Sequence, residues 1–442
     1  MDTLVQIAQF ILSLSLLIVL HEMGHFVPAR LFKTRVEKFY LFFNPWFSLF
    51  KKKIGQTEYG LGWLPLGGYV KIAGMVDESM DKKAMKEPPK PDEFRSKKAW
   101  QRLIIMLGGV TVNVILGIVI WAMIMWVWGD SYVSNRNLTW GVAVDSTMQE
   151  LGLRDGDKVL AIDGQPVERL NHVVTGIIFN KAQSVTVQRD GVEMNIALPE
   201  GSIKKMIAGL KNDQPLIEAR FPVVADSVEP GSVAAEAGLR NGDRIIAIDS
   251  MPVSYYHEFN RVKEATRGQQ VTVSVLRGSD TVELHAMMPT GTAPFGFRTE
   301  TSKYLSYDTI GYGFFAAFPA GLSKATTTLS DYWKQIKLMF SSEVNAAESV
   351  GGFISIGKVF SPDWDWKRFW IMTAWLSIIL AFMNLLPIPA LDGGHVMFLL
   401  VEVATGRKLP DKVLEYAQVV GMVLLLSLIV FANGADIIRL FK

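Results

Sequence analysis

Residues 4–29, LVQIAQFILSLSLLIVLHEMGHFVPA, decide the fold. The stretch is apolar over more than the ~20 residues that a helix needs to cross a bilayer. It differs from a secretory signal peptide, because it lacks a basic start and an Ala-x-Ala site and contains His21, Glu22 and His25. The sequence therefore predicts a retained transmembrane helix with ionisable side chains, which are expensive inside a membrane.

Three further apolar stretches follow, at residues 103–128, 370–403 and 413–432, and residues 370–403 contain a proline-rich break. With residues 4–29 they predict a polytopic α-helical membrane protein with four transmembrane helices. The composition, 49% hydrophobic and 20% charged, argues against a fully soluble enzyme and against a disordered chain. A formal net charge of +2 gives no field that would favour nucleic acid, so no nucleic-acid partner is expected.

The chain contains no cysteine. Disulfides, thiol nucleophiles, iron–sulfur clusters and cysteine-bound zinc are therefore excluded. Any bound metal must use the six histidines and the carboxylates.

The loop charges predict the orientation in the membrane. Residues 30–98 contain 15 Lys and Arg against 8 Asp and Glu, and short basic loops stay in the cytoplasm. The N-terminus and residues 130–368 are then extracytoplasmic. His21 lies about 26 Å along the first helix from Leu4 at ~1.5 Å per residue, which places it toward the cytoplasmic side.

A repeat occupies the middle of the chain. Residues 152–167, GLRDGDKVLAIDGQPV, and residues 238–253, GLRNGDRIIAIDSMPV, agree at ten of sixteen positions with a period of 86. Each copy predicts a strand, a turn and a second strand. The pattern resembles the PDZ domains of bacterial proteases, which implies two modules that bind an extended segment at a sheet edge. Modules that only space or filter are the alternative.

After the repeat, apolar residues between Leu322 and Phe340 recur at spacings of three, four and seven. This periodicity predicts an amphipathic helix. Such a helix would lie either in the membrane interface or against the repeat modules.

His21-Glu22-Met23-Gly24-His25 is an H-E-x-x-H motif on a helix. Positions i and i+4 share one face, so both imidazoles can bind one zinc ion, and Glu22 can take a proton from a metal-bound water. The alternative is a buried histidine pair that bonds to neighbouring helices.

A third ligand is expected, because catalytic zinc sites usually have three protein ligands and an open position. The candidate is Asp392, in the segment NLLPIPALDGGH at residues 384–395, with His395 as its rival. The remaining histidines, His172, His257 and His285, lie in the extracytoplasmic region and are expected to be surface or core residues.

The motifs HEMGH and NLLPIPALDGG, together with the repeat pair, resemble the site-2 protease family of intramembrane zinc metalloproteases, and within it the bacterial regulator-of-sigma-E protease branch. The resemblance covers nearly the whole chain. It implies that His21, His25 and Asp392 bind zinc, that Glu22 is the general base and that Asn384 holds substrate. It also implies residence in the bacterial cytoplasmic (inner) membrane.

The resemblance further implies single-span membrane substrates, such as a pre-clipped anti-sigma factor or remnant signal peptides. Many relatives have G-P-x-x-N in the second span, whereas this chain has Gly109-Val110-Thr111-Val112-Asn113. The kink that the proline would give is therefore not expected, and Asn113 is left to hydrogen bond between helices.

Residues 60–74, GLGWLPLGGYVKIAG, predict a β-hairpin with an exposed edge. Family members have a membrane-associated hairpin here that pairs with substrate, which makes Leu61, Trp63, Leu64, Gly67 and Gly68 candidate substrate-binding residues. A hairpin that only shields the site is the alternative.

These observations predict an intramembrane zinc endopeptidase that cleaves transmembrane segments. A catalytically inactive, PDZ-bearing membrane scaffold is the alternative. The expected regions are two helices with the hairpin loop, a first and a second PDZ-like domain, an amphipathic connection, and two further helices, at residues 1–129, 130–218, 219–300, 301–368 and 369–442.

Overall fold

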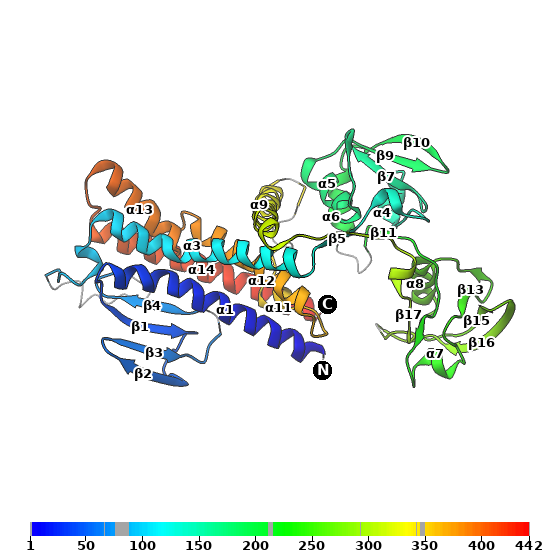
Figure 1. The fold of residues 1–442 in the computed structure, drawn as a ribbon, viewed down its shortest axis with the longest axis horizontal. Coiled ribbons are helices and arrows are strands. Elements are labelled where there is room, and N and C mark those ends of the chain that lie inside the picture. The colour runs from blue at the N-terminus through cyan, green and yellow to red at the C-terminus, as the bar shows by residue number, and fades with distance from the viewer. Residues whose placement is uncertain are drawn as a thin grey trace. The chain divides into compact units, whose positions relative to one another are not determined.

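The computed structural model describes residues 2–65, 67–75, 88–210, 215–291, 293–341, 343–344 and 350–441. The chain forms two compact units (Figure 1). Unit 1 comprises residues within 1–129, 311–340 and 345–442, and unit 2 comprises residues 130–310 and 341–344.

Four helices of unit 1 are long and apolar enough to cross a membrane, as the hydropathy predicts. They are α1 (Asp2–Leu31), α3 (Ala99–Val127), α12 (Trp366–Leu385) and α14 (Asp411–Leu440). Helices α1 and α12 both pack on α3 (Figure 1).

Helices α1 and α3 approach most closely at two glycines. A Cβ atom added at Gly24 would collide with the backbone of Gly108, and one added at Gly108 would collide with the backbone of Gly24. Small residues of this kind let helix backbones come together inside a membrane. The contact lies one residue before His25 and so determines how deeply that side chain is set against α3.

The third apolar stretch is not one helix. Helix α12 ends at Leu385, and the separate helix α13 (Asp392–Thr405) follows. Leu386 precedes Pro387 and is extended, with φ −60° and ψ 142°, because the proline ring disfavours helical geometry in the residue before it. Asp392 is consequently the first residue of a helix rather than an interior one.

Four strands of unit 1 form one sheet, and its order corrects the predicted hairpin. The strands are β1 (Val36–Leu41), β2 (Phe50–Ile54), β3 (Thr57–Leu61) and β4 (Tyr69–Ile72), in the order β2-β3-β1-β4. The hairpin expected within residues 60–74 is wrong, because β1 lies between β3 and β4.

Strand β1 lies inside the sheet because its side chains are buried and pack on β4. Val36 and Tyr40 are buried on one face, and Tyr40 stacks on Tyr69 of β4. The actual hairpin joins β2 to β3 through a two-residue turn that begins at Gly55, whose φ is +62°. Strand β4 is left as an edge strand next to α1.

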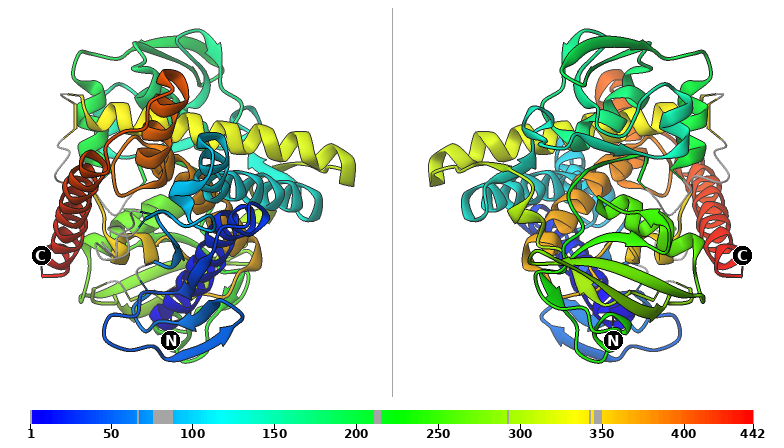
Figure 2. Two further views of the ribbon diagram at one scale, coloured as in Figure 1. Left: turned by 90° about the vertical axis from the view of Figure 1, so that its left-hand side faces the viewer. Right: turned by 90° about the vertical axis from the view of Figure 1, so that its right-hand side faces the viewer.

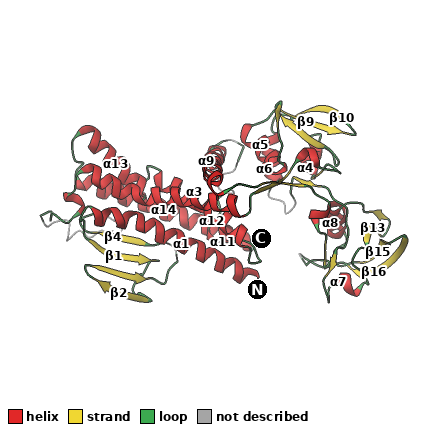
Figure 3. Cartoon of the chain, in the orientation of Figure 1, coloured by secondary structure: helices red, strands yellow, loops and turns green. Residues whose placement is uncertain are grey.

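Among the described residues, unit 2 contains two four-stranded sheets of matching order. Figure 3 shows strands of both sheets in yellow. The first, β10-β9-β7-β8, with helix α5 (Val173–Asn180), is called the first repeat. The second, β16-β15-β13-β14, with helix α8 (Tyr256–Ala265), is called the second repeat. Their strands are β7 (Lys158–Ile162), β8 (Gln165–Pro166), β9 (Ser184–Arg189), β10 (Val192–Ala197), β13 (Arg244–Ile248), β14 (Met251–Pro252), β15 (Gln270–Arg277) and β16 (Asp280–Met287).

The aspartate of the Gly-Asp turn, which both sequence copies share, forms the same buried ion pair with an arginine in each repeat. Arg189 donates through Nε and Nη2 to the two carboxylate oxygens of Asp157, both at 2.7 Å. Arg277 does the same to Asp243, at 2.8 and 2.7 Å. Each aspartate follows the glycine of the Gly-Asp turn, so the sequence repeat is also a structural repeat.

Helix α9 (Phe314–Met339) confirms the predicted amphipathic helix, which begins earlier than the periodicity indicated. It belongs to unit 1 and packs across α3 and α12 (Figure 2). Its buried face carries Ala317, Gly321 and Ala325. Gly321 packs against Ala122 of α3 so closely that no Cβ would fit.

The other described elements are short. They are β5 (Asp130–Val133), β6 (Val142–Val144), α4 (Ser146–Glu150), α6 (Ser202–Gly209), β11 (Ile217–Ala219), β12 (Ser227–Val228), α7 (Val233–Glu236), β17 (Phe297–Arg298), β18 (Tyr307–Ile310) and α11 (Phe353–Gly357).

Candidate metal centre

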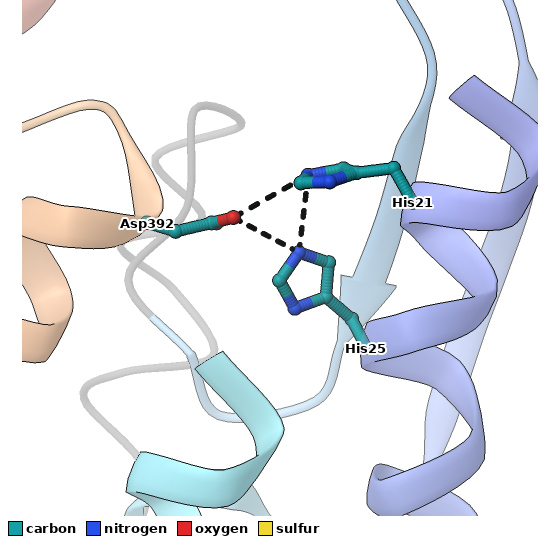
Figure 4. Close-up of side chains that lie close together, drawn as sticks. All are labelled: His21, His25 and Asp392. Carbon is teal, nitrogen blue, oxygen red and sulfur yellow. Dashed lines mark hydrogen bonds and ion pairs between the residues drawn. The ribbon is translucent and has the colours of Figure 1, made fainter. Parts of the chain in front are cut away.

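Helix α1 presents His21 and His25 on one face, because residues four apart lie one above the other. Their Nε2 atoms are 3.3 Å apart. Asp392, the first residue of α13, points between them, with its Oδ2 atom 3.3 Å from His21 Nε2 and 3.2 Å from His25 Nε2 (Figure 4). Among the described residues, this is the one group of three metal-binding side chains whose ligand atoms all lie within 4.8 Å of one another.

The hydrogen bond of His25 fixes which of its nitrogens can bind a metal. His25 Nδ1 lies 2.8 Å from the backbone oxygen of Ile105 on α3. A carbonyl oxygen only accepts, so Nδ1 carries the hydrogen and the neutral ring presents a lone pair at Nε2. That lone pair faces the carboxylate of Asp392.

The surroundings of the Asp392 carboxylate also favour a bound cation. Asp392 Oδ2 is buried and accepts no hydrogen bond from the part of the chain that the structure describes. Donors about 2.0–2.1 Å from an ion at tetrahedral angles are separated by about 3.3–3.4 Å, which matches the three observed separations. Two imidazoles and one carboxylate form a known zinc set, so these residues fit a zinc ion with one position left open.

A cavity of about 490 Å³ opens beside the three side chains, and Glu22 lines it. Val70 of β4 lines the same cavity. The edge strand of the sheet therefore reaches the cavity that the residue after His21 also lines. His395, the rival third ligand, lines the cavity as well but is not a member of the three-residue group.

The predicted substrate-binding residues divide into two sets. Gly67, Gly68 and Asn384 line the cavity, and Asn384 Nδ2 is 3.5 Å from His21 Nε2. Leu61, Trp63 and Leu64 are not among the described residues that line it.

The second set lies within the sheet and its adjoining turn. Trp63 donates from Nε1 to the backbone oxygen of Pro45 and stacks on Phe47. Leu64 forms a bridge with Phe43, and Leu61 ends β3. These positions follow from the strand order, which the hairpin prediction missed.

Of the four histidines outside the H-E-x-x-H motif, His172, His257 and His285 are in unit 2. His257 is buried, and its Nε2 lies 3.3 Å from Asp155, as expected of a core histidine. His285 pairs with Thr272 on the exposed face of the second repeat.

Residues of α3 complete the surroundings of the two imidazoles, and the sequence revealed them only in part. Gly109 lies against both rings, and a Cβ there would collide with His21 and His25. Asn113 Nδ2 lies 3.2 Å from His21 Nδ1. Both residues belong to the segment that departs from the G-P-x-x-N pattern, and α3 runs through it without interruption.

Comparisons with known proteins agree with this geometry. The profile of Peptidase family M50 matches residues 9–428. The chain is similar to the Regulator of sigma-E protease RseP of Escherichia coli, at 27% identity over 98% of both chains. It is also similar to Protease RseP of Yersinia pestis, at 28% identity over 100% of both chains.

The family match extends from the first transmembrane helix to the last, and so includes both helices that carry the three side chains. A relative of Xylella fastidiosa, 27% identical over 99% of both chains, is named "Putative zinc metalloprotease", which agrees with the donor set on α1 and α13. The chain belongs to peptidase family M50 and is a zinc metalloprotease of the membrane.

Proposed function

We propose that this protein hydrolyses peptide bonds within or next to transmembrane segments, with zinc held by His21, His25 and Asp392. The observation that carries the proposal is the convergence of three lone-pair donors beside a cavity that Glu22 also lines. The cavity lies among helices that are apolar enough to cross a membrane, so the substrate is proposed to enter the cavity from the bilayer.

When bound, zinc supplies Lewis acidity that lowers the pKa of a coordinated water to near 7 and polarises the scissile carbonyl. Glu22 takes the proton of the attacking water and later delivers it to the leaving amine. General acid–base transfer of this kind contributes about 10²–10⁴-fold to rate. Glu22 is placed for this role because its side chain lines the cavity beside the three donors.

The substrate is proposed to lie along β4. A transmembrane helix hides its amides, so cleavage requires a short extended stretch, and an edge strand can pair with one. Strand β4 is the edge of its sheet, and Gly67, Gly68 and Asn384 line the cavity between that edge and α12. Gly68 leaves no room for a side chain against Ile18 and the backbone of Tyr40.

The two repeats are proposed to be PDZ-like modules, at residues 130–218 and 219–300, that hold or screen substrates outside the cytoplasm. Their matching strand orders support the pairing of the two modules. The basic loop at residues 30–98 supports a cytoplasmic location for the sheet. One relative is named a regulator of sigma-E protease, and on that ground we propose substrates such as a pre-clipped anti-sigma factor.

The test is cleavage of a single-span reporter co-expressed with wild type or Glu22→Gln, with zinc measured in the purified proteins. We expect cleavage to fall by about 10²-fold or more in Glu22→Gln, because the proton acceptor is lost, while zinc stays at the wild-type ratio. Glu150→Gln is the matched control. It makes the same chemical change at a residue of unit 2, where Glu150 forms an exposed ion pair with Lys205.

Wild-type protein that neither holds zinc nor cleaves any reporter would overturn the proposal in favour of a membrane scaffold. Unchanged cleavage in Glu22→Gln would remove Glu22 from the chemistry.

A further inference from the structure

We infer that Asn113 is a positioning residue, which accepts a hydrogen bond from His21 Nδ1–H through its amide oxygen and so holds His21 Nε2 ready for the metal. The inference rests on the proposed zinc role of His21. It concerns a side chain of α3 that does not belong to the three-residue group itself.

The first step is the state of His21. Its Nε2 atom is the one that faces His25 and Asp392. An imidazole that gives its Nε2 lone pair to a metal carries its hydrogen on Nδ1, so Nδ1 must find an acceptor. The neighbour within hydrogen-bonding distance of Nδ1 is the Asn113 amide, at 3.2 Å.

The second step is an orphaned atom. Asn113 is fully buried, and its Oδ1 atom has no hydrogen-bond partner among the described residues, whereas its Nδ2 atom faces His21 Nδ1. Nδ2 is a donor, so it cannot satisfy a protonated Nδ1. Turning the amide by 180° about its last bond exchanges Oδ1 and Nδ2 at nearly the same positions. The oxygen then accepts from His21 Nδ1–H, and Nδ2 takes the position that Oδ1 held.

The third step is the match with the other imidazole. Ile105, Gly109 and Asn113 are four residues apart and therefore share one face of α3. Ile105 accepts from His25 Nδ1 through its backbone, Gly109 makes room for both rings, and Asn113 serves His21. Each metal-facing imidazole thus has an acceptor from the same helix face, one on the main chain and one on a side chain.

The backbone of Asn113 is also hydrogen-bonded to a neighbouring helix. Ser377 of α12 donates to the backbone oxygen of Asn113 at 2.7 Å. This contact restrains the turn of α3 that carries the amide without touching His21. Ser377→Ala is therefore a matched control that perturbs the same turn and leaves the side-chain acceptor in place.

The test compares zinc affinity of the full-length protein in detergent, by competition with a chromophoric zinc chelator. Asn113→Leu keeps the size and removes the acceptor, and we expect affinity to fall 10–100-fold, the usual effect of losing an outer-shell partner. Asn113→Asp can only accept, so we expect it to stay within about threefold of wild type. Ser377→Ala is expected to bind zinc as wild type does.

Cobalt gives a second readout, because its visible spectrum reports the geometry at the ion. We expect Asn113→Asp to keep the wild-type tetrahedral bands and Asn113→Leu to shift or weaken them. If Asn113→Leu does not fold, the comparison of Asn113→Asp with Ser377→Ala decides.

Two results would overturn the inference: wild-type affinity in Asn113→Leu, or a loss in Asn113→Asp as large as that expected for Asn113→Leu, since the amide would then act as a donor. Wild-type protein that binds no zinc would instead contradict the proposed function, so the two failures are distinguishable.

Discussion

Asp243 in the second repeat and Asp392 at the metal centre are both buried carboxylates, but their surroundings differ. Arg277 donates to both oxygens of Asp243, and the Arg240 backbone N–H donates to Oδ2 at 2.8 Å. Asp392 Oδ2 receives no hydrogen bond from the described residues and faces two imidazole nitrogens. The first carboxylate is saturated with donors, and the second is surrounded by other acceptors.

This difference in hydrogen bonding indicates that Asp243 stabilises the fold and that Asp392 binds a cation. A saturated buried charge needs nothing further, and removing it disturbs the structure around it. An unsaturated one in a native protein requires an explanation, and here a cation supplies it. The same contrast distinguishes Asp157, which is paired with Arg189, from the whole three-residue group.

The largest expected effect lies at Asp392. Asp392→Asn removes the anionic donor, so zinc affinity should fall by more than the 10–100-fold typical of an outer-shell loss, and reporter cleavage should disappear. Zinc content and cleavage measure this. The thermal stability of unit 2 should not change, and a variant that still holds stoichiometric zinc would point to His395 as the third ligand.

The corresponding substitution in unit 2, Asp243→Asn, should lower stability and leave zinc binding unchanged. Asp243→Asn removes the charged partner of Arg277, which keeps its hydrogen bond to the backbone oxygen of Gly238, and should lower the free energy of unfolding of the second repeat by about 1–3 kcal/mol. This is less than the loss of a fully buried ion pair would cost, because the Arg277 side chain is 26% exposed. Hydrogen exchange of the β13 and β15 peptides in the full-length protein measures it.

Zinc affinity should be unaffected by Asp243→Asn. Equal loss of zinc in this variant and in Asp392→Asn would erase the contrast between the two carboxylates.

The smallest expected effect is a pH dependence at the same pair. Burial alone would raise the pKa of Asp243, but the hydrogen bonds from Arg277 outweigh it and hold the pKa below its usual value. A lowered pKa in the folded state stabilises the fold above the unfolded value of about 3.9 and loses that effect as pH falls through the folded pKa.

The stability gap between wild type and Asp243→Asn should therefore close as the pH is taken below about 4. Thermal unfolding of both full-length proteins between pH 7 and pH 3 measures this gap. A gap that stays constant would mean that the Asp243–Arg277 pair does not titrate in this window.

Local patterns in the sequence predicted most of the membrane part. The four apolar stretches predicted the four helices that can cross a membrane, and the spacing of His21 and His25 placed both on one face. Asp392 stood out because it is a lone carboxylate beside a break that two prolines impose. Each of these signals is contained in a short window of sequence.

The strand order and the acceptor of His25 could not be predicted in this way. Strand β1 separates β3 from β4 through pairings between strands that are not neighbours in sequence, although Val36–Leu41 has the aromatic and β-branched composition of a strand. The acceptor of His25 is the main-chain oxygen of Ile105, and main-chain atoms are the same at every residue. Only the packing of α1 against α3 selects it.

The ligand set has a consequence for how the enzyme is made. His21 and His25 leave the ribosome early, whereas Asp392 is synthesised near the end of the chain. At 5–20 residues per second, about 20–70 s separate them. A nascent chain therefore has both histidines before the third donor is made, and we expect a chain truncated before α13 to hydrolyse no peptide bond.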